Sequence, residues 1–360
     1  MAAKVRQMWR CGDAEERRDV EAHTRTALRP ETTAATITSQ AAYYSRGIRH
    51  NSYNNAKHGY VGSLDGIRRM IGDKIGLTPV HFFSHGSTMM LGEKSESADY
   101  WRKTGEEALA HNIKGVIIMG AHWDCLGDKI EVATNPNPDK SPVAYVHPDK
   151  YINYKLNPDL ETAHRCIDML TKAGFNASGN PTFDWIHDVY LILIHMFPKG
   201  CPPTTIISMN ARYDPHYHMK VGATLRPLRY ENYLLIGTGG AVHNLYRNRW
   251  APMLRFRDNF AMETPPEEWA LEFRQAVEDV ITKTSGPALR RAMTRLMKHP
   301  QYRDAHATDD HFMAAMFVAG AMGDFEDTGS PAVLGAESWE LTNMCNSQFT
   351  LGSWSKDIAV

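Results

Sequence analysis

Three short apolar runs in this chain each lead directly to a histidine. They are residues 80–84 before His85, residues 116–121 before His122, and residues 234–242 before His243. Runs of this length that are rich in β-branched residues are typical of strands buried on both faces of a parallel sheet. Ligands of such sheets bind at the carboxyl ends of the strands. The pattern therefore predicts that these three histidines lie at one edge of a sheet.

Segments with a helical pattern of apolar residues alternate with the predicted strands. We expect helices over residues 97–110, with Ser97 as the N-cap, and over residues 159–173, 215–225, 265–282 and 287–297. Alternation of strands and helices predicts an α/β fold. We expect a single domain with a mostly parallel or mixed sheet that is flanked by helices on both faces.

The first part of the chain has no strong hydrophobic period. Residues 1–75 are therefore expected to form an N-terminal extension or arm, and residues 76–360 the core domain. Tyrosines in the extension suggest that it packs against another surface. An arm of this kind is a candidate for homo-oligomer formation.

The charge and the apolar content of the chain argue against nucleic acid and membranes as binding partners. The 40 basic and 41 acidic residues give a net charge of −1, so no global field attracts nucleic acid or an anionic membrane. No apolar stretch approaches the roughly 18 residues of a membrane span. The five cysteines are scattered and odd in number, which favours a reducing compartment over a disulfide framework. We expect a cytoplasmic protein.

Histidine is abundant, with 17 in the chain. Besides the three above, His187 precedes the apolar segment 189–197, and His311 precedes the apolar segment 312–321. We expect both at the start of a buried helix, with the acidic residues before His311 capping its helix. Three or four convergent imidazoles suit iron, copper or zinc, because histidine is the commonest ligand of such metals.

These motifs together resemble a known family. The chain is similar to the LigB-type extradiol aromatic ring-opening dioxygenases, in the branch of the 4,5-DOPA dioxygenases, over about residues 77–355. The matching motifs, in order, are His85-Gly86-Ser87, Ala121-His122-Trp123, residues 183–187 before an apolar helix, residues 242–245 around His243, and residues 307–311 ending at His311.

The resemblance implies a role for each histidine. It implies that His85, His122 and His311 are metal ligands, and that His243 either completes the coordination or donates a proton beside the metal. His187 would line the substrate pocket as an acid–base or catechol-orienting group. The implied cofactor is Fe(II), with zinc possible in the purified protein, and the implied substrates are a small catechol and O₂.

The chain departs from the family at two of these motifs. The family usually has Asp-His-Gly where this chain has Trp185-Ile186-His187-Asp188, and Pro-Thr-Pro-Glu-His or similar where it has residues 307–311. Both departures concern regions that face the substrate. They affect the identity of the substrate more than the metal.

Two other hypotheses are kept. Three histidines and a water also form the usual catalytic zinc site, so a zinc-dependent hydrolase or another metal-dependent reaction is the first alternative. A non-enzymatic interaction protein is the second, because a fold does not fix a function. Oxygen consumption that depends on Fe(II) separates the dioxygenase from both.

Overall fold

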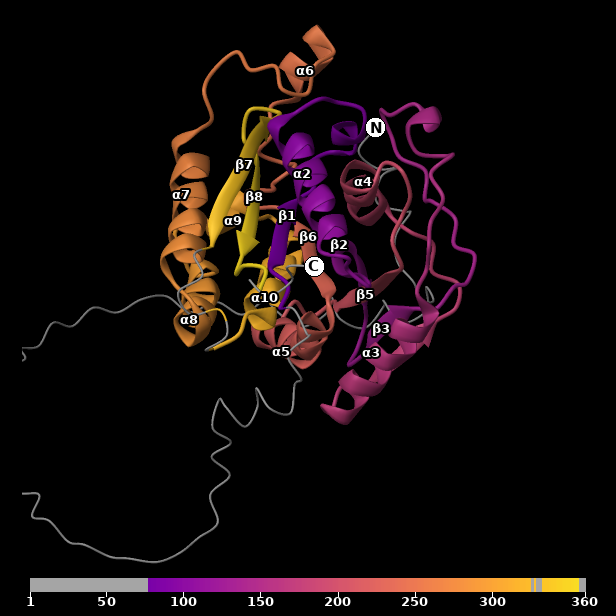
Figure 1. Ribbon diagram of the computed structural model, residues 1–360. Coiled ribbons are helices and arrows are strands. Elements are labelled where there is room, and N and C mark those ends of the chain that lie inside the picture. Colours follow the sequence, from indigo (N-terminus) through magenta and orange to yellow (C-terminus); the bar gives the residue numbers. More distant parts are fainter. Residues whose placement is uncertain (1–76, 325–326, 328–331, 356–360) are drawn as a thin grey trace, which may run out of the picture. The chain divides into compact units, whose positions relative to one another are not determined.

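The computed structural model describes residues 77–324, 327 and 332–355, and the expected N-terminal extension, residues 1–75, lies outside them. The described residues form one mixed sheet of eight strands with helices on both of its faces (Figure 1). The predicted α/β class and the mixed sheet are thereby confirmed. In the described part of the chain, no helix is both long enough and apolar enough to cross a bilayer.

The strands that precede the three histidines are neighbours in the middle of the sheet. Their order places β6 between β2 and β1, and both pairs are parallel. The full order is β4 (Ala177–Asn180), β3 (Ile130–Ala133), β5 (Thr204–Asn210), β2 (Gly115–Cys125), β6 (Tyr233–Gly239), β1 (Val80–Ser84), β8 (Met344–Leu351) and β7 (Val333–Glu340). The β1–β8, β7–β8 and β3–β5 pairs are antiparallel.

Two layers of helices cover the sheet. One apolar core contains residues of α2 (Glu96–Ala110) and α4 (His187–Met196). The other contains residues of α3 (Leu160–Lys172), α5 (Pro215–Leu225), α7 (Glu268–Lys283), α8 (Gly286–Leu296) and α10 (Asp310–Ala321). The shorter helices are α6 (Trp250–Phe256) and α9 (Tyr302–Ala305), with 3₁₀ turns η2 (Thr88–Leu91), η3 (Pro148–Lys150) and η4 (Arg226–Glu231).

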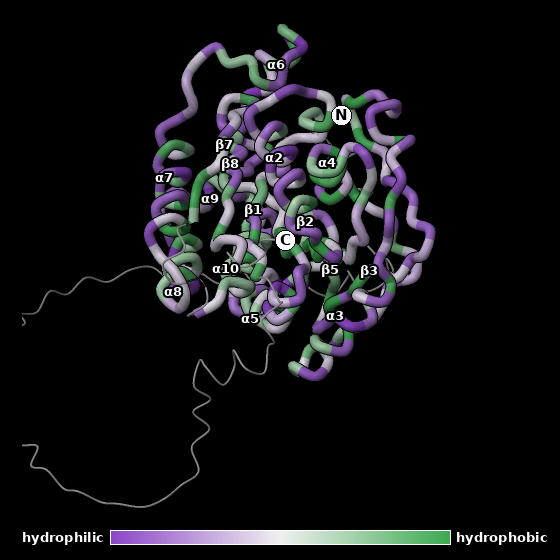
Figure 2. Tube along the Cα trace, viewed as in Figure 1, coloured by the Kyte–Doolittle hydropathy of each residue, from purple (hydrophilic) through white to green (hydrophobic). Residues whose placement is uncertain are grey.

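Alternation along β2 divides its side chains between these two cores. Val116 and Ile118 enter the core under α2 and α4, and Ile117 and Met119 enter the opposite one. Hydrophobic residues accordingly gather along the interior strands and on the inner sides of the helices (Figure 2). Because both faces of the central strands are buried, their sequences read as continuous apolar runs.

Helix α10 lies against the central strands, and every one of its residues after Asp310 is buried. Two glycines of β6 allow the approach: a Cβ at Gly239 would lie 2.0 Å from the carbonyl oxygen of His311, and one at Gly237 would lie 2.4 Å from that of Ala314. This contact brings the first turn of α10, with His311, to the carboxyl end of β6.

Several predicted boundaries were wrong. Helix α2 begins after Ser95, whose side chain accepts the N–H of Ala98, whereas Ser97 is buried in the first turn and bonds to Ser338. Strand β6 ends at Gly239, four residues before His243. The apolar character continues past the end of the strand because Ala241 and Val242 remain buried. Short strands were also predicted at residues 130–133, 204–209 and 348–354, where β3, β5 and β8 lie, but no strand was predicted at β4 or β7.

Candidate metal centre

Five histidine rings gather at the carboxyl end of β1, β2 and β6. The ring centroid of His85 lies 5.0 Å from that of His122, 5.1 Å from that of His311, 5.8 Å from that of His187 and 6.3 Å from that of His243. Three of the rings come from the ends of the parallel strands and two from the starts of α4 and α10. The structure therefore brings together every histidine that the sequence singled out for the site.

A buried carboxylate fixes the loop that carries His85. Gly86 has a φ of +68°, and a Cβ there would lie 2.3 Å from Oε2 of Glu340. Glu340 accepts hydrogen bonds from the backbone N–H and the hydroxyl of Ser87, at 2.9 and 2.5 Å, and from the amides of Asn259 and Asn346. Burial raises the pKa of Glu340, and these donors oppose the effect. Glycine is required here by both the backbone conformation and the close carboxylate.

His122 lies within β2, three residues before the strand ends at Cys125. Its backbone N–H donates to Oδ2 of Asp188 at 2.9 Å, and its Nδ1 lies 3.5 Å from the same oxygen. That separation is in the range of an ion pair, although the ring makes no hydrogen bond there. The side chain of Asp188 is buried, so its carboxylate is held beside His122 away from solvent.

His187 is the first residue of α4, as expected from the apolar segment that follows it. The N-cap residue Ile186 supplies no side-chain hydrogen bond to the helix. The acidic residue of the first turn, Asp188, lies near the positive end of the helix dipole instead. The centroid of the His187 ring lies 4.5 Å from that of His122.

His243 and His311 form a stacked pair. Their centroids lie 3.6 Å apart and their planes differ by 8°. The backbone N–H of His243 donates to the carbonyl of Ala305 at 2.9 Å, which ties its loop to the segment before α10. On His311, Nδ1 and the backbone N–H both lie 2.6 Å from Oδ1 of Asp310.

The expected acidic cap of α10 is present only in part. The N-cap residue is Asp309, but it makes no side-chain cap hydrogen bond. Its carboxylate instead accepts from the hydroxyl of Tyr302 and from Arg303. Asp310 accepts the N–H of its own neighbour His311, so this carboxylate orients the histidine ring as well as the helix start.

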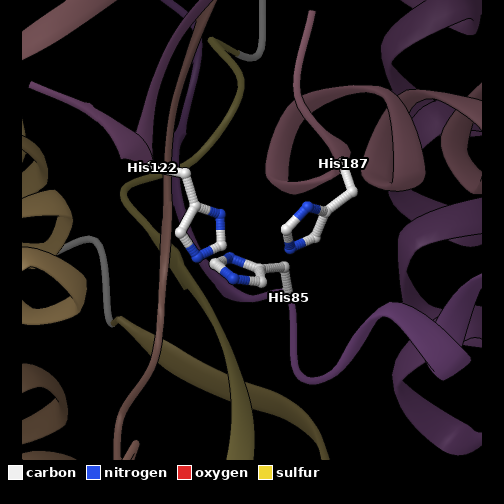
Figure 3. A group of neighbouring side chains, drawn as sticks. All are labelled: His85, His122 and His187. Atoms are coloured by element: carbon white, nitrogen blue, oxygen red, sulfur yellow. The ribbon is translucent and has the colours of Figure 1, made fainter. Parts of the chain in front are cut away.

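Unpartnered ring nitrogens show that the cluster fits a divalent metal. Both nitrogens of His85, Nδ1 of His122 and Nε2 of His311 are buried without a hydrogen-bond partner in the described part of the chain. Buried polar atoms are normally paired, since an unpaired one costs about 1–3 kcal/mol. One ligand atom each of His85, His122 and His187 lies within 4.8 Å of the other two, and Figure 3 shows these three rings facing one another.

Burial favours the neutral form of four of the rings, which is the form that binds a metal. It lowers the pKa of His85, His187 and His243 well below 6.5, and neighbouring histidines lower it further. The pKa of His122 is also lowered by burial, although Asp188 opposes the shift. Burial alone would raise the pKa of Asp310, but the adjacent His311 holds it below its usual value.

Two sets of metal ligands are compatible with the geometry of the cluster. The predicted set was His85, His122, His243 and His311, whereas the three closest ring nitrogens belong to His85, His122 and His187. His85 and His122 are common to both sets. The assignment of the others stays a prediction.

Sequence reasoning missed the carboxylates and the glycine around the cluster. In the folded protein, Asp188 contacts His122 and Gly120, and Glu340 contacts Ser87. Along the chain, however, Asp188 is 66 residues from His122, and Glu340 is 253 residues from Ser87. A single acidic residue inside an apolar helix start was the available signal for Asp188. No signal in the sequence distinguished Glu340 from a surface glutamate.

Comparison with known proteins agrees with this architecture. The family model "Catalytic LigB subunit of aromatic ring-opening dioxygenase" matches residues 79–345. The chain is 24% identical over 282 residues to a 4,5-DOPA dioxygenase extradiol of Beta vulgaris, covering 75% of this chain and 95% of that protein. It is 21% identical over 274 residues to a protein of the same name from Escherichia coli K12, covering 76% and 94%.

A solved structure shares the fold. The crystal structure of an uncharacterized protein from Escherichia coli K12 aligns with a TM-score of 0.60 at 20% identity, and the alignment covers 76% of this chain and all of that one. At this identity, the likeness concerns the fold.

Proposed function

Because the chain belongs to the family of catalytic LigB subunits of aromatic ring-opening dioxygenases, we propose that it is an extradiol dioxygenase. It opens the aromatic ring of a catechol-type substrate with O₂, next to the two hydroxyl groups, at a divalent metal held by histidines. The observation that carries the proposal is the cluster of five histidine rings, with buried unpartnered nitrogens, at the carboxyl edge of the sheet.

We assign His85, His122 and His311 as the metal ligands. Both nitrogens of His85 are buried without a partner. On His122, Nδ1 lies 3.5 Å from Oδ2 of Asp188, which leaves Nε2 for a metal. On His311, Asp310 occupies Nδ1 and leaves the buried Nε2 free, and metal-binding histidines commonly pair their second nitrogen with a carboxylate in this way. Its ring centroid lies 4.9 Å from that of His122 and 5.1 Å from that of His85. When bound, Fe(II) supplies a path for electrons from the ring to O₂ and favours the ionised catechol.

His187 and His243 are the two rings that this assignment leaves for proton transfer. Both are neutral near pH 7 because burial lowers their pKa, so each can accept a proton. His187 accepts a hydroxyl proton from the catechol at the start of α4. His243 is stacked on His311, whereas His187 lies against His122. His243 is therefore a second group that can take up and release a proton beside the metal. Positioned acid–base groups of this kind contribute about 10²- to 10⁴-fold to a rate.

Two carboxylates balance the charge of the site. Asp188 and Asp310 lie beside His122 and His311, and together they offset the charge of a divalent ion. His85 and His311 are shielded from water, at 0% and 5% exposure, whereas the side chain of His122 is 28% exposed. Exclusion of water strengthens each of these electrostatic interactions.

Oxygen uptake tests the proposal. The full chain is reconstituted with Fe(II) without oxygen and then mixed with O₂ and a panel of catechols that includes DOPA, caffeate and protocatechuate. We expect one O₂ consumed for each catechol lost, with a new visible absorbance from the ring-opened semialdehyde. Uptake by none of the catechols, with the metal bound, would contradict the assignment and favour a hydrolytic zinc site.

A further inference from the structure

Asp188 is a buried carboxylate whose role in the proposed function is so far limited to balancing charge. It is 1% exposed and is the second residue of α4, directly after His187. Burying an unpaired charge destabilises a protein. Near the start of a helix, the helix dipole stabilises a negative charge and offsets part of this penalty. Helix formation alone does not explain this position, because the rest of α4 is apolar apart from its two histidines and contains no other acidic residue.

The carboxylate lies against the backbone of β2. The ladder between β2 and β5 is interrupted between Met119 and Asp124, and within this gap the N–H of His122 donates to Asp188 at 2.9 Å. A Cβ at Gly120 would lie 2.3 Å from the same Oδ2 and 2.9 Å from Cγ of Asp188. The strand therefore has room for this carboxylate only because residue 120 is glycine.

We propose that Asp188 is a positioning residue, which holds the His122 ring with Nδ1 toward the carboxylate so that Nε2 is presented to the metal. The inference rests on the proposed metal centre. Its basis is the 3.5 Å separation of His122 Nδ1 from Oδ2 of Asp188. Histidines that bind a metal usually direct their second nitrogen to such a carboxylate, which fixes the tautomer and the ring orientation.

A purely structural role explains less. A neutral amide would accept the backbone N–H of His122 equally well and would avoid the cost of a buried charge. A carboxylate adds two properties that an amide lacks: it accepts strongly from an N–H at Nδ1, and its charge attracts a cation bound on the far side of the ring.

The Asp188→Asn variant distinguishes a positioning role of Asp188 from a purely structural one. The amide oxygen of the introduced side chain would still accept the N–H of His122, but the charge and the preference for Nδ1–H are lost. The full-length apo-protein is titrated with Co(II) against a chromophoric chelator, and its visible spectrum is recorded. We expect the variant to bind Co(II) about 10- to 100-fold more weakly, with a changed absorption band and a nearly unchanged Tm of the apo-protein.

Asp327→Asn is the matched control. Asp327 is also 1% exposed, and it pairs with Arg229 outside the cluster of five histidines, with Oδ2 2.7 Å from Nη1. This variant should lower the Tm and leave the Co(II) affinity unchanged. If Asp188→Asn instead lowered the Tm while keeping the affinity and spectrum of the wild type, Asp188 would be structural and the inference would be overturned.

Gly120→Ala provides a second route that leaves the charge in place. The added methyl group displaces the carboxylate from His122, so we expect weaker Co(II) binding here too. Unchanged affinity in both variants would overturn the positioning role alone. Wild-type protein that bound no Co(II) would overturn the metal centre together with this role, so the two failures are distinguishable.

Discussion

The imidazole rings of His243 and His311 are parallel within 8°, with centroids 3.6 Å apart. An imidazole binds a metal through a lone pair in the plane of its ring. Two rings stacked face to face cannot both direct such lone pairs at one ion, so this arrangement allows at most one member of the pair to be a ligand. Asp310 holds Nδ1 of His311, which makes His311 the better placed of the two.

His85→Ala and His122→Ala should each abolish tight metal binding. Both residues belong to the proposed ligand set and also to the group of closest ring nitrogens. Metal content after dialysis against Fe(II) or Zn(II) measures the effect, and the exposed His147→Gln serves as the control. Stoichiometric metal in either alanine variant would remove that residue from the ligand set.

His311→Ala and His187→Ala distinguish the two candidates for the third ligand. With His311 as ligand, His311→Ala loses the metal, whereas His187→Ala keeps it and loses turnover through its proton-transfer role. Metal analysis and oxygen uptake are measured on the same samples. The reverse pattern would make His187 the third ligand, as its ring nitrogen lies within 4.8 Å of those of His85 and His122.

His243→Ala should keep the metal and lose turnover. The stacked arrangement leaves His243 outside the ligand set, and its lowered pKa leaves it neutral for proton transfer. We expect a loss of about 10²- to 10⁴-fold in kcat. Loss of the metal in this variant would show that His243 completes the coordination instead.

The apo-protein should lose stability as the pH falls below about 6.5. The pKa values of His85, His187 and His243 are lowered in the folded protein from 6.5, so below this pH the unfolded chain binds more protons. Their contribution is fully present above the unfolded pKa and is lost on acidification. Each histidine that stays neutral contributes up to about 1.4 kcal/mol per pH unit.

Denaturant unfolding of the apo-protein between about pH 7 and pH 5 measures this slope. His85→Ala should reduce it. A free energy of unfolding that did not change across this range would contradict the neutral, buried state of the cluster.

Gly86→Ala should destabilise the loop that carries His85. An alanine at a φ of +68° costs roughly 1–2 kcal/mol in backbone strain, and displacing Glu340 adds roughly 1–3 kcal/mol. Gly127→Ala is the matched control, since its φ is +71° but nothing lies within 4 Å of its Cβ. Equal losses in the unfolding free energies of the two variants would show that the contact with Glu340 is unimportant.

The sequence predicted the parts of the site that local patterns encode. The apolar runs before His85 and His122 identified β1 and β2, because strands buried on both faces leave a continuous hydrophobic signal. The parallel order β2-β6-β1 then brought the ends of these strands together. His187 and His311 were placed at helix starts by the apolar segments after them, as observed.

The rest depends on contacts between distant parts of the chain. The pairing of β7 with β8, and the contacts of Glu340 with Ser87 and of Asp188 with His122, join segments that carry no shared local pattern. Ser97 was predicted as a cap because serine favours that position, but tertiary contacts with Ser338 and Asn346 placed it inside the helix. The stacking of His243 on His311 likewise follows only from the packed fold.

Incorporation of isotopically labelled O₂ tests the central claim most directly. Fe(II)-loaded protein is allowed to react with the catechol that supports the fastest uptake, and the product is reduced at once with borohydride, because an aldehyde oxygen exchanges with water. We expect a ring-opened product that carries both atoms of one labelled O₂, and no product with His85→Ala. A product that carried one labelled atom or none, or equal turnover by His85→Ala, would contradict dioxygenase chemistry at this histidine cluster.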